Sequence, residues 1–267
     1  MNISSLEKRL GSKFGSDWTI GVSTLLSPYN PIRGVNNLLE TDLGVKRFEI
    51  ALARHPENEE EITRELQELK KDHNLTYSVH TPFLYDNLAH PKDRIREVHV
   101  SEGKKALDLA ARIGARHVVF HPGELFFRRH LPPIEVFEPF KKSRKSYLKN
   151  SLQSLIELSD HGATRDVTLL VENLPHGLCD RSEEVKHLLS RIENGEFLLD
   201  IGHANISGTI GELLKLKPKY FHFNDNDGET DNHRPIGEGT IDFNKLLADL
   251  SSYEGAKTMI LELYYLE

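Results

Sequence analysis

The sequence contains a single cysteine, Cys179, so an intramolecular disulfide is excluded. Such a cysteine content is typical of the reducing cytosol, and we expect a cytoplasmic protein. No apolar run reaches the roughly 18 residues that a membrane-spanning helix requires, and no apolar segment of signal-peptide length follows Met1. We therefore expect no membrane contact.

Positive charge is also in deficit. The chain has 34 lysines and arginines against 41 aspartates and glutamates, for a formal net charge of −7. This balance argues against a broad basic surface for nucleic acid, although a local basic groove stays open. Low-complexity segments, glycine- and serine-rich linkers and long repeats are absent too, so we expect one domain over residues 1–267. Nothing indicates an obligate protein partner.

The chain does contain a repeated alternation of short apolar segments and helical patterns. Strands are expected near 18–24, 45–52, 76–81, 117–121, 168–173, 196–201, 219–223 and 257–263. Helices are expected near 31–42, 58–73, 93–113, 141–160, 181–193, 208–216 and 243–252. Strands rich in Val, Ile and Leu, without hairpin turns, predict an α/β fold, a closed parallel (β/α)₈ TIM barrel. An open doubly wound sheet would show a glycine-rich phosphate loop after its first strand, and residues 25–34 lack one.

The two chain ends form an irregularity in this barrel. The sequence ends at Glu267, directly after the eighth expected strand, so we expect no eighth helix. Residues 1–17 carry Leu6, Leu10 and Phe14 at helical spacing and predict an N-terminal helical extension. Our hypothesis is that this helix folds across the gap. A frayed tail or a plug beneath the barrel is the competing interpretation.

Histidine, aspartate or glutamate follows the C-terminal end of each strand from the third to the eighth. In a TIM barrel these ends meet at the face that carries the active site. Glu172 and Glu262 each end an apolar run, where an unpaired carboxylate would be costly unless a cation or a proton lies beside it. We therefore predict a metal centre with these ligands: His80, His121, Glu172, Asp200, His203, His222, Asp231, His233 and Glu262.

The donor types narrow the choice of metal. A mixture of imidazole and carboxylate suits Zn²⁺ or Mn²⁺ better than Ca²⁺, which prefers oxygen ligands. Each position also has an ordinary structural interpretation. Asp200 could cap a helix, Asp231 could be a turn residue, and a lone histidine at a strand end is more often a hydrogen-bonded core residue. The convergence of all these positions favours the metal.

The motifs around these residues resemble the xylose isomerase-like superfamily of TIM barrels and, within it, the endonuclease IV family (AP endonuclease family 2). The resemblance runs from about residue 18 to residue 263. The matching segments are VHTPF at 79–83, NLAHP at 87–91, FHPGE at 120–124, VEN at 171–173, LDIGHA at 199–204, FHFND at 221–225, DNHRPIGEG at 231–239 and ILE at 260–262.

The resemblance to endonuclease IV implies up to three zinc ions. His80 and His121 would bind the first, and Glu172 would bridge to the second. Asp200, His222 and Glu262 would complete the second, while His203, Asp231 and His233 would hold the third. The implied activity is zinc-dependent hydrolysis of the DNA backbone 5′ to an abasic site, which is a DNA repair reaction with abasic DNA as the partner.

The sequence departs from the endonuclease IV pattern in its expected loops. Phe83 stands where a tyrosine is common, the loop 27–34 has Arg33 as its only basic residue, and the loop after Glu172 is short. Basic residues follow the fourth strand instead, and Arg128, Arg129 and Lys145 are candidate contacts to a substrate phosphate. A solvated helix face is the competing interpretation of this basic segment, 128–149.

A sugar or sugar-phosphate isomerase or epimerase is the alternative that the same resemblance supports. The segments DNDG at 225–228 and PIGEGTID at 235–242 resemble such enzymes. One divalent cation (zinc, manganese or cobalt) would be held by Glu172, Asp200, His222 and Glu262. Glu172 and Glu262 would move a proton between adjacent carbons as catalytic base and acid. We favour the hydrolase because His203, Asp231 and His233 form a ready third site. A non-enzymatic barrel would be expected to have lost ligands.

Overall fold

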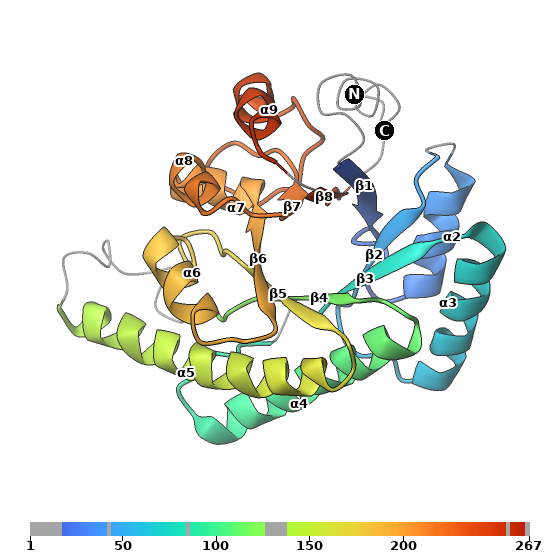
Figure 1. Ribbon diagram of the computed structural model, residues 1–267, viewed down its shortest axis with the longest axis horizontal. Coiled ribbons are helices and arrows are strands. Elements are labelled where there is room, and N and C mark those ends of the chain that lie inside the picture. The colour runs from blue at the N-terminus through green and yellow to red at the C-terminus, as the bar shows by residue number, and fades with distance from the viewer. Residues whose placement is uncertain (1–17, 42–43, 84–85, 126–137, 255–256, 265–267) are drawn as a thin grey trace.

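The computed structural model describes residues 18–41, 44–83, 86–125, 138–254 and 257–264. Eight parallel strands form a closed barrel in which each strand pairs with the next and β1 pairs with β8 (Figure 1). The strands are β1 (Trp18–Ser23), β2 (Arg47–Ala51), β3 (Thr76–His80), β4 (His117–Phe120), β5 (Thr168–Glu172), β6 (Gly195–Asp200), β7 (Tyr220–Phe223) and β8 (Lys257–Leu261). The predicted (β/α)₈ TIM barrel is therefore confirmed.

Helices connect these strands around the outside of the barrel. They are α2 (Pro31–Glu40), α3 (Glu59–His73), α4 (Asp93–Arg112), α5 (Glu138–Ala163), α6 (Ser182–Leu189), α7 (Ile201–Ser207), α8 (Ile210–Leu213), the 3₁₀ turn η3 (Leu214–Leu216) and α9 (Phe243–Ser251). The long helices α4 and α5 lie side by side along one flank of the barrel (Figure 1). None of the helices in the described ranges is both long and apolar enough to cross a lipid bilayer.

The sequence predictions for the two chain ends and for the segment after β6 can be compared with the structure. The predicted helical extension at residues 1–17, with its proposed packing across the barrel, lies outside the described residues. Within the described residues no helix follows β8. The short helix α7 was not predicted, and it begins at the residue directly after β6.

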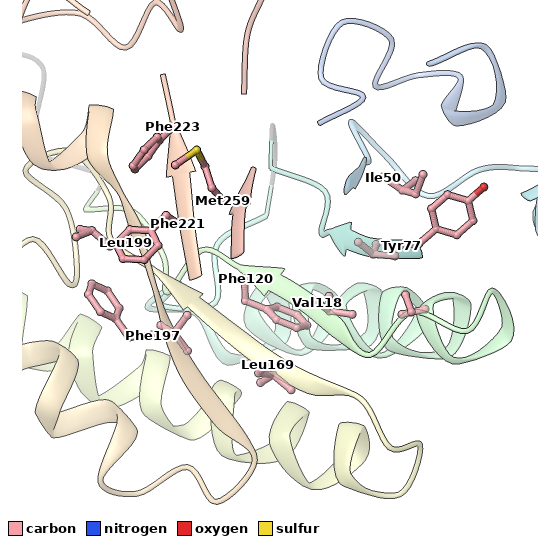
Figure 2. Close-up of a cluster of buried hydrophobic side chains, with 14 of the residues drawn as sticks. Ile50, Tyr77, Val118, Phe120, Leu169, Phe197, Leu199, Phe221, Phe223 and Met259 are labelled. Carbon is pink, nitrogen blue, oxygen red and sulfur yellow. The ribbon is translucent and has the colours of Figure 1, made fainter. Parts of the chain in front are cut away.

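Both faces of the barrel strands are buried, and they differ in character. The outward side chains pack against the helices in one large core, which includes Ile50, Tyr77, Val118, Phe120, Leu169, Phe197, Leu199, Phe221, Phe223 and Met259 (Figure 2). Inside the barrel, Val119, Leu170 and Leu198 form a smaller apolar cluster. Because side chains alternate along a strand, the next inward residues after Leu170 and Leu198 are Glu172 and Asp200. The barrel interior thus changes from apolar to acidic at the C-terminal ends of its strands.

Arg144 fastens α5 to the segment that follows β5. Its Nε donates to Oε1 of Glu184 at 2.5 Å, and its terminal nitrogen contacts Asp180 and donates to the backbone oxygen of Gly177 at 2.8 Å. The side chain of Arg144 is only 12% exposed, and that of Glu184 only 8%. This arginine of the basic segment 128–149 therefore has a structural role.

We expect the substitution Arg144→Met to lower the free energy of unfolding by about 3–5 kcal/mol, because it leaves two buried carboxylates without their partner. Arg116→Met is the matched control, since Arg116 pairs with Asp166 where both side chains are more than 70% exposed. The control should cost less than about 1 kcal/mol. Urea denaturation of both variants measures the difference, and equal losses would contradict a stabilising role for the buried pair.

Candidate metal centre

The C-terminal ends of the strands bring the predicted ligands to one mouth of the barrel. His80, Glu172 and Asp200 are the last residues of β3, β5 and β6. The strand register places Asp200 directly beside His222 of β7. His121 follows β4 and Glu262 follows β8, whereas His203 lies in α7, and Asp231 and His233 lie in the loop between β7 and α9.

All nine predicted ligands fall into four groups, three of which share residues, and within each group the candidate ligand atoms lie within 4.8 Å of one another. The groups are His80–His222–Glu262, His80–His121–Glu172, His203–Asp231–His233 and Glu172–Asp200–His222–Glu262. Imidazole nitrogens and carboxylate oxygens are suitable donors for zinc and related divalent cations. Groups of this composition could hold a metal ion, and the assignment of ligands and metal stays a prediction.

Glu172 lies at the centre of the arrangement and has no exposed surface. Its Oε2 is 3.2 Å from Nε2 of both His80 and His121. Its Oε1 is 3.3 Å from Nδ1 of both His203 and His222. One carboxylate therefore contacts imidazoles from four parts of the chain, and each of its two oxygens faces a different pair of imidazoles.

Hydrogen bonds to the backbone fix the orientation of three of the imidazoles. Nδ1 of His80 donates to the carbonyl of Thr81 at 2.9 Å, and Nδ1 of His203 donates to the carbonyl of Asn173 at 2.8 Å. Nδ1 of His233 donates to the carbonyl of Glu262 at 3.1 Å. Because a carbonyl can only accept, Nδ1 carries the proton, and Nε2 is left to face the carboxylates. Metal-binding histidines are typically held in this way.

Asp231 joins two of these imidazoles. Its Oδ2 is 3.1 Å from Nε2 of His203 and 3.3 Å from Nε2 of His233. Its Oδ1 is buried without a hydrogen-bond partner, as expected for an atom placed to meet a cation. The donor types and this orphaned oxygen both fit a divalent metal.

The charges of the cluster stabilise one another. Burial alone would raise the pKa of Glu172, but the imidazoles of His222 and His121 hold it well below its usual range. Burial alone would lower the pKa of His233, but Asp231 raises it to about 9. Asp200 behaves differently, because burial raises its pKa to about 6 although His203 opposes the rise. Protonated imidazoles thus supply positive charge at the place where a cation would, so protons and a cation compete for the same carboxylates.

Helix α7 explains how His203 reaches the site. Oδ1 of Asp200 caps this helix by accepting from the backbone N–H of His203 at 2.5 Å. Oδ2 of the same carboxylate accepts from Asn224 at 3.1 Å and lies 4.0 Å from Nδ1 of His222. The capping interpretation of Asp200 is therefore confirmed, and the residue still faces the cluster with its second oxygen.

The loop that carries Asp231 and His233 is held by a buried carboxylate, Asp225. Oδ2 of Asp225 accepts the backbone N–H groups of Gly237 and Gly239, each at 2.9 Å. Its Oδ1 accepts the backbone N–H groups of Asn226 at 2.9 Å and Ile241 at 3.2 Å. The segments DNDG and PIGEGTID therefore bind each other, and together they fix the loop between them.

Glu49 is missing from the ligands predicted above, yet it contacts one of them. It lies within the apolar strand RFEIA of β2 and is 1% exposed, and its Oε1 is 3.0 Å from Nε2 of His222. An acidic residue inside an apolar run is the same signal that identified Glu172. The sequence prediction considered residues at strand ends, and Glu49 lies in the middle of its strand.

A small cavity of about 70 Å³ opens above the cluster. Seven of the predicted ligands line it, all except Asp200 and His222. The other lining residues are Leu25, Ala51, Phe83 and Tyr264, which give the cavity an apolar wall. A ligand in this cavity would meet polar donors on one side and apolar surface on the other, as is common in small-molecule sites.

The predicted phosphate contacts are not brought to this cavity by the described residues. Lys145 is exposed on α5 and does not line the cavity. Arg128 and Arg129 lie outside the described residues. Contact of these three residues with a phosphate stays a prediction.

Comparison with known proteins identifies related chains. The family described as "Xylose isomerase-like TIM barrel" matches residues 40–265. The uncharacterized protein MJ1614 of Methanocaldococcus jannaschii is 28% identical over 198 residues, which cover 73% of this chain and 74% of the relative.

Solved structures share the fold over nearly the whole chain. A D-tagatose 3-epimerase-like protein superimposes with a TM-score of 0.78 at 23% identity, covering 93% of this chain and 91% of the other. A protein from Thermus thermophilus, soaked with ZnCl₂, superimposes with a TM-score of 0.70 at 24% identity, covering 93% and 92%. At these identities the likeness shows a common fold.

We expect Gly239→Ala to displace the loop that carries Asp231 and His233. A Cβ atom at this position would lie 2.2 Å from both the Asn226 carbonyl oxygen and Oδ1 of Asp225, so the Asp225 contacts must shift. The expected cost is about 1–3 kcal/mol of unfolding free energy, with weaker zinc binding. Gly211→Ala in α8, where nothing lies within 4 Å, is the control and should be neutral or slightly stabilising. Wild-type zinc affinity in the Gly239 variant would contradict this role of the loop.

The apparent affinity for zinc should rise with pH up to about pH 9, the value to which the pKa of His233 is raised. Below that pH the imidazole holds a proton that zinc must displace, and above it the nitrogen is free to bind. Competition with a chromophoric chelator measures the affinity. Calorimetry in two buffers with different ionisation enthalpies counts the released protons. An affinity independent of pH, with no proton release, would show that His233 is not a zinc ligand.

Proposed function

Because the chain belongs to the xylose isomerase-like TIM barrel family, we propose that it is a divalent-metal-dependent isomerase or epimerase of a small sugar or sugar phosphate. The observation that carries this proposal is the group Glu172, Asp200, His222 and Glu262, which four consecutive strands bring together in the barrel mouth. All four residues are at most 4% exposed. One cation in this group would suffice for the reaction.

The names of similar structures support a sugar as the substrate. Besides the D-tagatose 3-epimerase-like protein, a D-psicose 3-epimerase and an L-ribulose 3-epimerase share this fold. The expectation of DNA hydrolysis has no such support among these comparisons, so the alternative weighed from the sequence becomes the main proposal. The cavity combines candidate ligand residues with an apolar wall that includes Phe83 and Tyr264, a mixed lining that is common in small-molecule sites.

A bound divalent cation would polarise the carbonyl and hydroxyl oxygens of the substrate. The remaining chemistry is assigned to the two glutamates. Both line the cavity, and both are held ionised: His222 lowers the pKa of Glu262 to about 2 although burial opposes the change. An ionised carboxylate can take a proton from a carbon beside a carbonyl and, now protonated, can return it to the neighbouring carbon. For inversion at one carbon, the second glutamate would first take a proton from solvent and then give it to the opposite face, while the first releases its proton to solvent.

The positions of these glutamates are fixed by their neighbours. His80 and His121 contact Oε2 of Glu172, which limits rotation of that carboxylate. His222 contacts Oε2 of Glu262 at 3.2 Å. We assign His203, Asp231 and His233 to the orientation of the substrate by hydrogen bonds. Zinc, manganese or cobalt would each suit the donor set, and the choice among them is part of the test.

A phosphodiesterase of endonuclease IV type is the second candidate. One observation favours it: His203, Asp231 and His233 form a complete group that an isomerase with a single metal does not require. In that case the metal content would approach three zinc ions per chain, and the substrate would be abasic DNA.

The proposed reaction is tested by solvent exchange. The protein is loaded with Zn²⁺, Mn²⁺ or Co²⁺ and incubated in D₂O with ketopentoses, ketohexoses and their phosphates. NMR then follows deuterium incorporation at the carbon beside the carbonyl. We expect exchange with at least one sugar, and a loss of about 10²–10⁴-fold in Glu172→Gln and Glu262→Gln. Glu229→Gln, in an exposed part of the same mouth, should keep the wild-type rate.

Two further measurements make the result decisive. The metal content of each variant separates a loss of proton transfer from a loss of the ion. A duplex with one abasic site is incubated with the same loaded protein. Nicking of this duplex without exchange of any sugar would overturn the isomerase proposal in favour of the hydrolase.

A further inference from the structure

A buried carboxylate below the candidate metal centre has no role in the function proposed above. Glu49 faces the interior of the barrel, where it lines a cavity of about 10 Å³ with Leu170 and Leu198. Its neighbours Phe48 and Ile50 face outward into the main core. A carboxylate in apolar surroundings is costly unless it is paired, so the partners of Glu49 indicate why it is there.

Glu49 has two such partners. Its Oε2 accepts a hydrogen bond from the hydroxyl of Ser78 at 2.9 Å, across the pair of strands β2 and β3. Its Oε1 lies 3.0 Å from Nε2 of His222, on the opposite side of the barrel. Among the described residues no arginine or lysine forms an ion pair with Glu49. Both Oε1 of Glu49 and Nε2 of His222 are buried, and neither has a hydrogen-bond partner of standard geometry among the described residues, so the 3.0 Å approach is an ion-pair contact between two otherwise unpartnered atoms. Arg47 lines the same cavity but does not come within ion-pair distance of Glu49, so the imidazole of His222 is the charged group in direct contact with this carboxylate.

His222 is oriented differently from the other imidazoles of the site. His80, His203 and His233 each give Nδ1–H to a backbone carbonyl and present Nε2 to a carboxylate, although Nδ1 of His203 also lies 3.3 Å from Glu172. In His222 it is Nδ1 that faces the carboxylates, at 3.2 Å from Glu262 and 3.3 Å from Glu172. For Nδ1 to offer a lone pair to a cation, the proton must lie on Nε2, and Nε2 lies 3.0 Å from Oε1 of Glu49.

We propose that Glu49 is a positioning residue of the metal centre, whose carboxylate holds the ring of His222 with the proton on Nε2 and the lone pair of Nδ1 directed at the cation. This inference rests on the metal site of the proposed function. Carboxylates behind a metal-binding imidazole fix its tautomer and increase its basicity, and their removal typically weakens metal binding by about 10–100-fold. Glu49 takes the place that a backbone carbonyl occupies behind the imidazoles of His80, His203 and His233.

The test measures metal affinity and the spectrum of a bound ion. Glu49→Leu removes the carboxylate and leaves an apolar side chain beside Leu170 and Leu198, while Glu49→Gln keeps the shape and loses the charge. We expect zinc affinity, from competition with a chelator, to fall about 100-fold in the leucine variant and about 10-fold in the glutamine variant. The visible bands of the Co²⁺-loaded protein should shift in the leucine variant, because the ring of His222 is no longer held.

Glu196→Gln is the matched control. Glu196 lies on β6 on the same inward face as Leu198, at the other end of the strand from the cluster. It should bind zinc and cobalt as the wild type does. Thermal unfolding of the metal-free variants separates positioning from stability, since a purely structural role would lower the unfolding temperature and leave the affinity and the cobalt spectrum unchanged.

Each outcome bears on one claim or both. Wild-type affinity and an unchanged cobalt spectrum in the Glu49 variants would overturn this inference and leave the proposed function standing. Failure of the wild-type protein to bind any of the ions would overturn both. If the leucine variant does not fold, the glutamine variant decides, because an unchanged zinc affinity there contradicts a role for the charge.

Discussion

The carboxylate of Glu172 is fully buried, and the residues at the mouth of the barrel are placed so that they neutralise its negative charge. Imidazoles from β3, β7, α7 and the residue after β4 approach its two oxygens. The apolar cluster of Val119, Leu170 and Leu198 lies below and offers the charge no polar contact of its own. In such surroundings a carboxylate is stable only with positive charge beside it, whether from protonated imidazoles or from a cation. The same constraint explains why so many histidines meet at one place.

The barrel could be predicted because its signal is repeated with every strand, and because parallel strands buried on both faces are nearly continuous apolar runs. The candidate ligands followed from the barrel, since residues at the ends of parallel strands must meet. Helix α7 could not be predicted in the same way. Its sequence, IGHANIS, begins directly after the strand, and the helix depends on the cap that Asp200 gives to the N–H of His203. The sequence allowed Asp200 to be a helix cap or a metal ligand, but it did not indicate a helix directly after the strand.

Contacts between residues far apart in the sequence could not be predicted from any local pattern. Glu49 and His222 lie on β2 and β7, strands that do not pair with each other, and no spacing along the chain reports a contact across the barrel interior. The choice between a sugar and DNA is similarly absent from the ligand set. Glu172, Asp200, His222 and Glu262 serve either proposal, so these four residues do not distinguish a sugar from DNA.

The side chain of Asp225 accepts four hydrogen bonds, all from main-chain N–H groups. These hydrogen bonds fix the backbone of the loop and do not depend on its side chains. The exception is position 239, where a side chain would collide with Asp225 and Asn226, so glycine is required. The exposed stretch around Glu229 and Thr230 can therefore change its chemistry while the fixed stretch keeps its shape. New ligand preferences can therefore evolve through single substitutions in the exposed stretch around Glu229 and Thr230, while Asp231 and His233 stay in place.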